Sequence, residues 1–158
     1  MTTATQKIKP APVCKSIRVN APQARAFDVF TLRMGTWWPP SHSLLKSPCK
    51  ETRVEPRAGG RWYQIGEDGS ECDNGKVLLW QPPSKVILTW QINSKFVFDE
   101  KVESEVEVNF IAENAGVTRV ELEHRIITVD DAEALRKAVD APNGWTAILE
   151  NYARVAAA

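Results

Sequence analysis

Apolar and polar residues alternate with a period of two along most of the chain, and this pattern predicts β-strands. Residues 13–19 show it first, and six further segments show it at residues 50–55, 60–66, 71–80, 85–92, 103–113 and 117–128. Turn-forming residues at 56–59, 68–69, 82–83 and 114–116 separate the later segments. The pattern predicts one strand followed by a six-strand antiparallel run. Residues 93–102 fit no period and predict a longer loop or an irregular edge.

A short helical insertion is expected after the first strand. Asn20 is a candidate helix cap, and Pro22 fits a first helical turn, where no backbone donor is needed. Apolar residues then recur at positions 27, 30 and 34, which is helical spacing. Gly35 ends or kinks this helix, and Trp37-Trp38-Pro39-Pro40 cannot continue it.

Helical spacing returns near the end of the chain. Asp130 or Asp131 could cap a short helix that carries Leu135 and Val139. Asn143-Gly144 then opens a final helix. Its apolar stripe consists of Trp145, Ile148, Leu149, Tyr152 and Ala153.

Turn lengths fix which residues of neighbouring strands lie opposite each other, and so which share a face. The predicted pairs are Trp62 with Gly75, Gln64 with Asp73, Val77 with Leu88, Leu79 with Val86, Phe110 with Val120 and Val106 with His124. These registers give one apolar face, which includes Trp90, and one polar face, which includes Asn74 and Trp80. One helix cannot cover the apolar face of a curved sheet completely, so we expect a cavity between the sheet and the final helix.

Three polar residues, Gln64, Asp73 and His124, fall on the apolar face by this argument. They could lie at strand ends, hydrated or bonded to the backbone. They could also orient a ligand in a mostly apolar pocket. A third reading makes Asp73 a general acid or base with His124 nearby, because burial beside Gln64 would raise its pKa.

Six tryptophans are many for 158 residues. Trp62, Trp90 and Trp145 are expected to point inward, while Trp37 and Trp38 lie at the break after the first helix. Each could simply fill the core, but together with Phe27 and Phe110 they would form a wall suited to a flat ligand. His42 is a candidate for the mouth of this pocket.

Composition excludes several classes of protein. Lys and Arg number 20 and Asp and Glu number 20, so the chain lacks the cationic excess that nucleic-acid binding requires. No apolar run approaches the roughly 18 residues of a membrane span, and the first residues lack the apolar core of a secretory signal. The three cysteines lack CxxC spacing, so they indicate neither disulfides nor a metal site. The sequence contains no dinucleotide-binding motif, no P-loop and no GxSxG motif, so it indicates neither a nucleotide cofactor nor a serine hydrolase. We expect a cytoplasmic protein with a disordered arm at 1–11 and a single domain at 12–158.

An ordered set of short motifs resembles a known family. These are Trp37-Trp38-Pro39, Gly59-Gly60-Arg61-Trp62-Tyr63, Glu67-Asp68-Gly69, Gly75-Lys76-Val77, Pro82-Pro83, Thr118-Arg119-Val120, Leu122-Glu123-His124, Gly144-Trp145 and Ile148-Leu149. In order and spacing they resemble the family named after the activator of the heat-shock-protein-90 ATPase, in the START-like (SRPBCC, birch-pollen-allergen-like) superfamily.

The resemblance implies an α+β helix-grip fold, in which a curved antiparallel sheet of six to seven strands wraps a long C-terminal helix. Relatives in the superfamily bind lipids, hormones or polyketides, and some are cyclases or dehydratases. The eukaryotic activators carry a separate N-terminal domain, for which these 158 residues have no room. We therefore do not expect a chaperone partner. The family supplies no agreed catalytic residue.

Our leading hypothesis is a module that binds a hydrophobic or aromatic small molecule without catalysis, cofactor or metal. Its expected ligand-binding residues are Trp37, Trp38, Trp62, Gln64, Asp73, Val77, Leu88, Trp90, Phe110, His124 and Trp145. One alternative is an enzyme of the polyketide cyclase or dehydratase type that uses Asp73 and His124. Another is a co-chaperone-like interaction module or homodimer, built on Trp80, Phe96 and Phe98.

Overall fold

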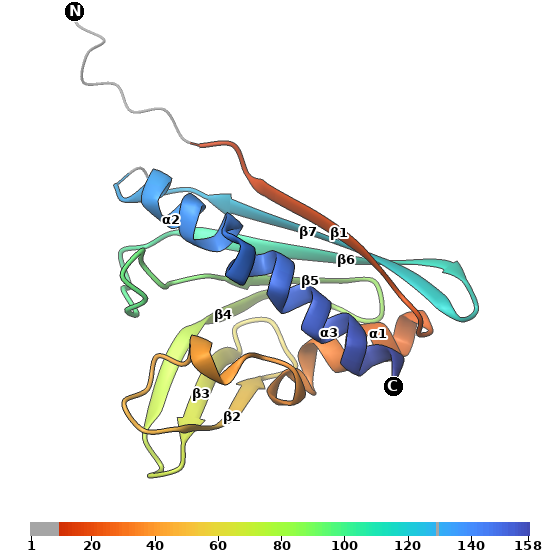
Figure 1. Ribbon diagram of the computed structural model, residues 1–158, viewed down its shortest axis with the longest axis horizontal. Helices are drawn as coiled ribbons and strands as arrows, with labels where there is room; N and C mark the ends of the chain where they lie inside the picture. The colour runs from red at the N-terminus through yellow and green to blue at the C-terminus, as the bar shows by residue number, and fades with distance from the viewer. Residues whose placement is uncertain (1–9, 129) are drawn as a thin grey trace, which may run out of the picture.

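A seven-stranded antiparallel sheet forms the body of the protein, as the alternating pattern predicts. The computed structural model describes residues 10–128 and 130–158, so most of the predicted arm at 1–11 lies outside the described residues. The strand order is β1-β7-β6-β5-β4-β3-β2 (Figure 1). The strands are β1 Val13–Val19, β2 Cys49–Val54, β3 Arg61–Gly66, β4 Glu71–Gln81, β5 Lys85–Thr89, β6 Ser104–Asn114 and β7 Val117–Ile126.

Helices cover one face of this sheet. The insertion after β1 consists of α1 Gln23–Thr31 and two short turns, η1 Met34–Thr36 and η2 Pro40–His42. At the end of the chain come α2 Ala132–Asp140, the wide turn η3 Pro142–Thr146 and α3 Ala147–Ala157. Figure 1 shows α2 and α3 running one after the other across the sheet. This is the expected α+β helix-grip fold, except that the long helix is broken at η3.

The side chains of Asn20 and Asp131 do not cap the helices that follow them. Pro22 is the N-cap residue of α1 and no side chain caps that helix, so the Asn20 cap is wrong. Asp131 is the N-cap residue of α2, as one of the two candidates predicted, but it has the left-handed conformation and its side chain makes no hydrogen bond to the helix. Its carboxylate instead accepts hydrogen bonds from Ser94 N–H at 2.9 Å and Ser94 O–H at 2.6 Å, which lower its pKa. These bonds tie the loop after β5 to the start of α2.

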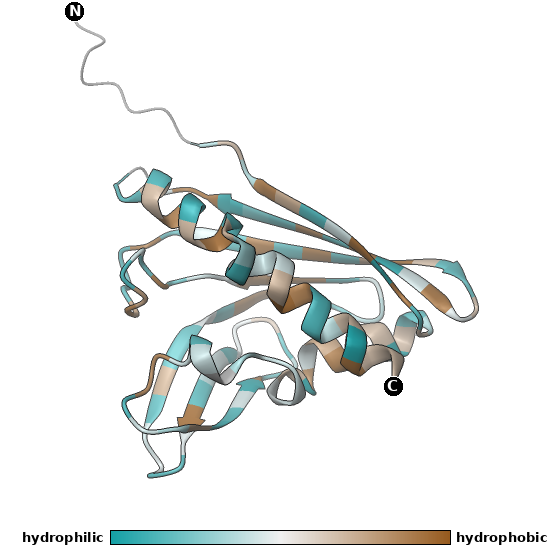
Figure 2. Ribbon diagram, in the orientation of Figure 1, coloured by the Kyte–Doolittle hydropathy of each residue, from teal (hydrophilic) through white to brown (hydrophobic). Residues whose placement is uncertain are grey.

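The predicted register of β6 against β7 is confirmed. Val106 lies opposite His124 and Phe110 opposite Val120, as the three-residue turn implies. Polar and apolar residues alternate along β1, β6 and β7 in Figure 2. Because opposite residues of an antiparallel pair share a face, one apolar face points toward the helices.

Two bulges in β4 overturn other predicted registers. Trp62 lies opposite Gly75 as expected, but the next pair is Tyr63 with Asp73, which leaves Asn74 as an extra residue. Gln64 therefore lies opposite Cys72. Asp73 consequently points to the outer face, and Asn74, predicted outside, is completely buried. A bulge shifts the alternation by one residue, so every side chain beyond it changes face.

The second bulge lies between Val77, which is opposite Leu88 as predicted, and Leu79. Beyond it Leu79 is opposite Ile87 and Trp80 is opposite Val86, so the predicted outward position of Trp80 is wrong. Its ring packs edge to face on Phe27, with centroids 5.1 Å apart. Trp80 therefore belongs to the edge of the core.

Gly75 permits the close approach of β5 to β4 between the two bulges. A Cβ atom at this position would lie 2.0 Å from the carbonyl oxygen of Thr89. A larger residue would have to push the strands apart. Gly75 also lies opposite Trp62 of β3, so it stands between Trp62 and the Thr89 backbone of β5.

Candidate functional site

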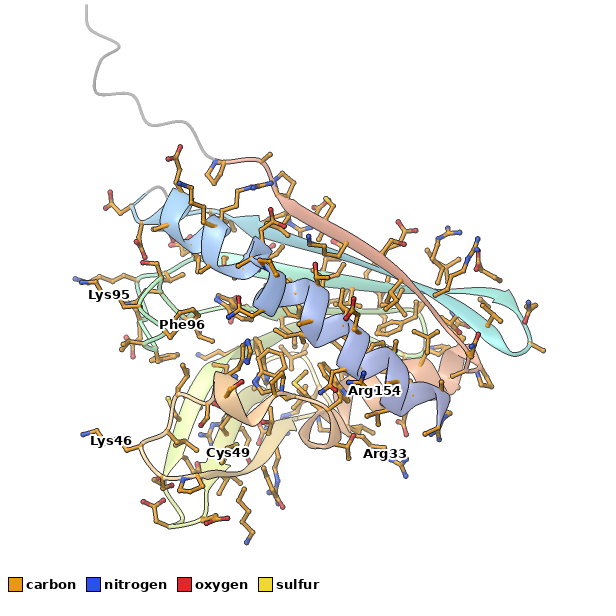
Figure 3. All side chains as sticks on the ribbon, in the orientation of Figure 1. Arg33, Lys46, Cys49, Lys95, Phe96 and Arg154 are labelled. Atoms are coloured by element: carbon orange, nitrogen blue, oxygen red, sulfur yellow. The ribbon has the colours of Figure 1, made fainter. Side chains whose placement is uncertain are left out.

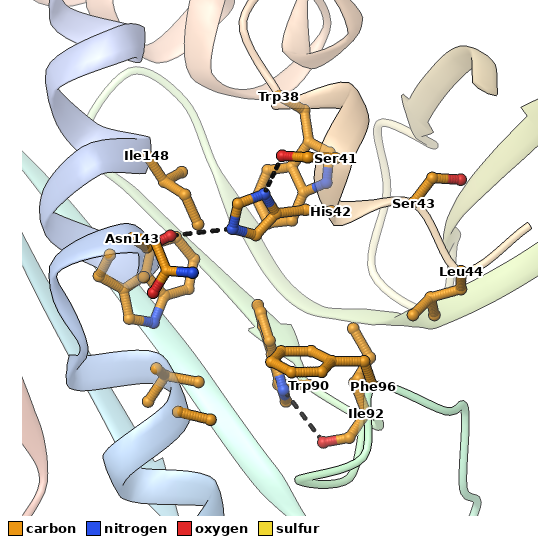
Figure 4. A pocket seen from close by; sticks show the side chains of 14 residues that line it. Trp38, Ser41, His42, Ser43, Leu44, Trp90, Ile92, Phe96, Asn143 and Ile148 are labelled. Carbon is orange, nitrogen blue, oxygen red and sulfur yellow. Dashed lines mark hydrogen bonds between the residues drawn. The ribbon is translucent and has the colours of Figure 1, made fainter. Parts of the chain in front are cut away.

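A cavity of about 220 Å³ opens between the helices and the sheet. Three segments surround it, namely residues 38–44 around η2, the loop residues 92–96, and the helix break at residues 138–148 (Figure 4). Its lining consists of Trp38, Ser41, His42, Ser43, Leu44, Trp90, Ile92, Phe96, Ala138, Val139, Asn143, Gly144, Trp145 and Ile148. The three indoles are among the six tryptophans that the sequence singles out.

Three indole rings wall the cavity. The centroid of Trp90 lies 5.4 Å from that of Trp145, and the Trp38 centroid lies 6.3 Å from Trp90 and 6.2 Å from Trp145. The N–H of Trp145 donates to His124 Nδ1 at 3.0 Å, and that of Trp90 donates to the Ile92 carbonyl at 3.2 Å. Since both donors are already used, these two rings present carbon surface to a ligand.

His124 holds these walls in place without lining the cavity. Its Nδ1 accepts the Trp145 N–H, so in the neutral ring Nε2 carries the hydrogen and donates to Ser104 Oγ at 3.0 Å. The Ser104 hydroxyl in turn donates to the carbonyl oxygen of Trp90 at 2.7 Å. These hydrogen bonds therefore connect Trp90 and Trp145 through the His124 imidazole.

The imidazole of His124 is neutral at ordinary pH. The side chain is completely buried, and burial together with the nearby charge of Arg125 lowers its pKa from 6.5 to about 3. Both ring nitrogens are committed to protein partners. His124 is therefore a positioning residue for the indole walls and has no nitrogen left for a ligand.

Polar groups gather on one rim of the cavity. His42 Nε2 lies 2.9 Å from the carbonyl oxygen of Asn143, so the two sides of the cavity are linked across η2 and η3. His42 Nδ1 lies 3.1 Å from Ser41 Oγ. Figure 4 shows the imidazole between these two partners, on the opposite side of the cavity from Phe96. The predicted place of His42 at the mouth agrees with this geometry.

Phe96 forms the other lip of the mouth. It is 58% exposed and has a φ of 60°, a conformation that side chains with a Cβ rarely adopt. Asn93 Oδ1 accepts the backbone N–H groups of Lys95 and Val97, and Ser94 is fixed by Asp131. The loop is thus built to hold an aromatic ring at the entrance.

The break between α2 and α3 shapes the third side. Gly144 has non-helical backbone angles, and a Cβ atom there would lie 2.2 Å from the Val139 carbonyl oxygen. Pro142 stands at the start of η3, where a helix needs no backbone donor. Trp145 and Ile148 then enter the cavity from the following turn. The sequence pattern gives the start of this helix but not its offset from α2.

The other predicted site residues lie outside the lining. Trp62 stands behind the wall, with its centroid 5.7 Å from those of both Trp38 and Trp90. Trp37 packs on Phe30 and Tyr152 on the far side of Trp38. Val77, Leu88 and Phe110 are buried in the core, and Gln64 Oε1 accepts the N–H of Leu44 at 3.1 Å.

Asp73 is removed from the cavity by the bulge. Its carboxylate pairs with Arg61 at 2.8 Å on the outer face, and its side chain is 42% exposed. Since His124 is buried on the inner face, the two do not form the acid–base pair of the enzyme hypothesis. The predicted surface of Trp80, Phe96 and Phe98 is also divided, because Trp80 packs inward. A homodimer stays a prediction.

Several lining residues were not predicted from the sequence, including Ser41, Ser43, Ile92 and Asn143. Ser41 and Ser43 belong to a segment that has no period, whereas Ile92 lies beyond the end of β5 at Thr89 although the pattern predicts a strand as far as residue 92. The signals near them in the sequence were His42 and, in the unassigned stretch 93–102, Phe96. Within residues 10–128 and 130–158, no cluster of His, Cys, Asp or Glu could hold a metal, and no helix is long and apolar enough to cross a membrane.

Comparisons with known proteins agree with this architecture. The family described as Activator of Hsp90 ATPase homolog 1-like protein matches residues 20–157. A solved anthrahydroquino-γ-pyrone synthase, Txn09, is 38% identical, with a TM-score of 0.64 over 93% of this chain and 97% of that chain. A search of curated proteins finds no match.

Two further solved structures share the fold. CalC, a self-sacrificing resistance protein from Micromonospora echinospora, is 26% identical, with a TM-score of 0.68 over 92% of this chain and 94% of that chain. An HSP90 activator from Plasmodium falciparum, PFC0360w, is 22% identical, with a TM-score of 0.62 over 92% of this chain and 96% of that chain. At that identity the likeness concerns the fold alone.

Proposed function

Because this chain belongs to the Activator of Hsp90 ATPase homolog 1-like family, a group of START-like proteins, we propose that it binds a small, flat, mostly apolar aromatic molecule in the cavity at Trp38, Trp90 and Trp145. The family and its structural neighbours fit a ligand-binding module of this type. The observation that supports an aromatic ligand is the set of indole walls, two of which already donate their N–H groups to protein acceptors.

The size of the cavity supports a small ligand. Pockets for drug-sized molecules have volumes of about 300–1,000 Å³, and this one has about 220 Å³. Stacking on indole faces favours planar rings, and Ile92, Phe96 and Ile148 add apolar surface. The name of the synthase Txn09 also refers to a compound with fused aromatic rings. A two-ring compound such as naphthalene is therefore a suitable first probe.

Naphthalene binding can be located by nuclear magnetic resonance. We expect saturable changes at the indole N–H signals of Trp90 and Trp145, with those of Trp37 and Trp80 unchanged. Isothermal titration calorimetry gives the affinity. If naphthalene near its solubility limit produces neither heat nor signal changes, or if it perturbs Trp37 and Trp80 instead, the proposal is wrong.

Two substitutions on α2 provide a matched control. Ala138 lines the cavity, whereas Ala134, one turn earlier on the same helix, is exposed. Ala138→Phe should place a ring in the cavity and weaken naphthalene binding at least about 10-fold, which corresponds to about 1.4 kcal/mol. Ala134→Phe makes the same chemical change on the surface and should leave the affinity within about 2-fold of the parent, or about 0.4 kcal/mol.

A second candidate function is catalysis in the same cavity, and the 38% identity with the synthase Txn09 favours it. Ring closure of an aromatic polyketide needs a group that moves a proton. The chain has two histidines, and His124 has no free nitrogen, so His42 would take this role. Turnover of a hydroxyaryl ketone that His42→Phe abolishes would support an enzyme, and binding without turnover would support the binding module.

A further inference from the structure

No charged side chain lines the cavity among the residues that the structure describes. Lys95 belongs to the same loop as Phe96, but Figure 3 shows it pointing away from the body of the protein. A charged ligand would therefore lose its hydration between indole faces without gaining an opposite charge, which is costly. The cavity is suited to an uncharged molecule.

Hydrogen bonds to a ligand would come from the rim of the cavity, because the three wall indoles have no accessible N–H group. The N–H groups of Trp90 and Trp145 are bonded to Ile92 and His124. The Trp38 Nε1 atom is buried away from solvent. An aromatic ligand between these faces would direct a polar substituent toward the rim at Ser41 and His42, where side-chain oxygen and nitrogen atoms are accessible.

The protein contacts of His42 define what this rim can accept. A carbonyl oxygen has no hydrogen to donate, so the contact with Asn143 assigns the hydrogen to Nε2. In the neutral ring Nδ1 is then an acceptor, and its partner at 3.1 Å is the hydroxyl of Ser41. That hydroxyl is on an exposed side chain and can rotate away. A ligand hydroxyl can take its place.

We infer that the cavity selects an uncharged hydroxylated aromatic compound, a phenol or naphthol, whose hydroxyl donates to His42 Nδ1. This inference rests on the proposed function and names the class of ligand for the same site. His42 is then a specificity-determining residue. Its bond to Asn143 fixes the orientation of the acceptor.

The test compares 2-naphthol with 2-methoxynaphthalene, which has a similar shape but cannot donate a hydrogen bond. By calorimetry at pH 7, 2-naphthol should bind about 3- to 10-fold more tightly, the range that one added hydrogen bond provides. A carboxylate, 2-naphthoate, should bind at least about 10-fold more weakly than 2-naphthol because its charge has no partner. Tighter binding of 2-naphthoate would overturn the inference.

Variants of the rim identify the acceptor. His42→Phe retains a flat ring but no nitrogen, and His42→Gln retains an amide near the position of Nε2 but nothing at Nδ1. Each of these two variants should bind 2-naphthol and 2-methoxynaphthalene with equal affinity. Ser41→Ala should keep or increase the preference for 2-naphthol, because it removes a competitor for Nδ1. Thermal melting establishes that each variant is folded.

The outcomes separate the two proposals. If neither 2-naphthol nor 2-methoxynaphthalene binds, the proposed function fails. If both bind the parent protein equally, the cavity takes aromatic molecules but the inferred preference is wrong. If the preference persists in His42→Phe and is lost in Ser41→Ala, Ser41 is the acceptor and the role of His42 is overturned.

Discussion

Two groups of aromatic side chains lie side by side between the sheet and the helices, and one of them borders the cavity described above. The closed cluster consists of Phe27, Phe30, Trp37, Phe110 and Tyr152. The open cluster consists of Trp38, Trp62, Trp90 and Trp145 with His124. Trp37 and Trp38 are neighbours in sequence and belong to different clusters.

In the closed cluster every ring with a polar atom has a partner. Trp37 donates to the Val29 carbonyl at 2.7 Å, and the Tyr152 hydroxyl donates to the Ala26 carbonyl at 2.7 Å. Both acceptors are backbone groups of α1, which lies against α3. Burial raises the pKa of Tyr152, so this phenol stays protonated.

The open cluster contains buried polar atoms without such partners. The Nε1 atoms of Trp38 and Trp62 have no hydrogen-bond partner within the described parts of the chain. Each such group costs about 1–3 kcal/mol. The difference teaches that aromatic content alone does not make a pocket. The cavity forms where the covering helix is broken at η3.

Replacing one ring in each cluster should give the largest contrast. Phe30 is 1% exposed and contacts three other rings, so Phe30→Ala should lower the free energy of unfolding by about 3–5 kcal/mol. Phe96→Ala, at the exposed mouth, should change it by no more than about 0.5 kcal/mol. Urea denaturation measures both.

The effects on ligand affinity should be in the reverse order, with the larger loss in Phe96→Ala. Phe96→Ala removes part of the cavity lining and should weaken naphthalene binding, whereas folded Phe30→Ala should retain the parent affinity. If the two variants lose affinity equally, the two clusters are not independent.

Low pH should destabilise the protein through His124, which belongs to the open cluster. The pKa of His124 is about 3 in the folded protein and about 6.5 when exposed, so the unfolded state binds a proton that the folded state does not. Stability should therefore fall as the pH drops below about 6.5, by up to about 1.4 kcal/mol per pH unit from this group. Urea denaturation at pH 7, 6 and 5 tests this slope.

A non-titrating His124→Asn variant is the control. Carboxylates contribute to the pH dependence of both proteins, so the difference between the two slopes isolates His124. Equal slopes would mean that His124 is not held neutral in the folded protein.

The smallest effect is expected outside both clusters. Asp73→Asn removes an exposed ion pair with Arg61, and such pairs contribute about 0–1 kcal/mol. Naphthalene affinity should be unchanged, because the side chain lies on the outer face. A loss of affinity comparable to that of Ala138→Phe would restore Asp73 as a site residue.

The sequence predicted the sheet well because alternation and turn residues are local signals. The register of β6 against β7 follows from one short turn, and the structure agrees with it. Bulges in β4 were not visible, because an extra residue leaves regular alternation on either side. The positions of Asp73, Asn74 and Trp80 changed for this one reason.

The candidate site was predictable only in part. The facing argument placed Trp90 and Trp145 inward, and both line the cavity. It could not predict that Trp38 lines the cavity and Trp37 does not, because their positions depend on the path of the chain after α1. Residues 41–44 and 92–96 enter the site through hydrogen bonds of irregular backbone, such as those of Asn93, which no period reveals.

The break at η3 divides the covering helix into two parts with different neighbours. Residues 138–148 border the cavity, while Tyr152 and Ala156 are buried on the closed side. Substitutions at Ala138 or Asn143 can therefore change what the protein recognises while the closed cluster stays packed. In evolutionary terms, this separation allows one scaffold to diversify its small-molecule preferences while its architecture is retained.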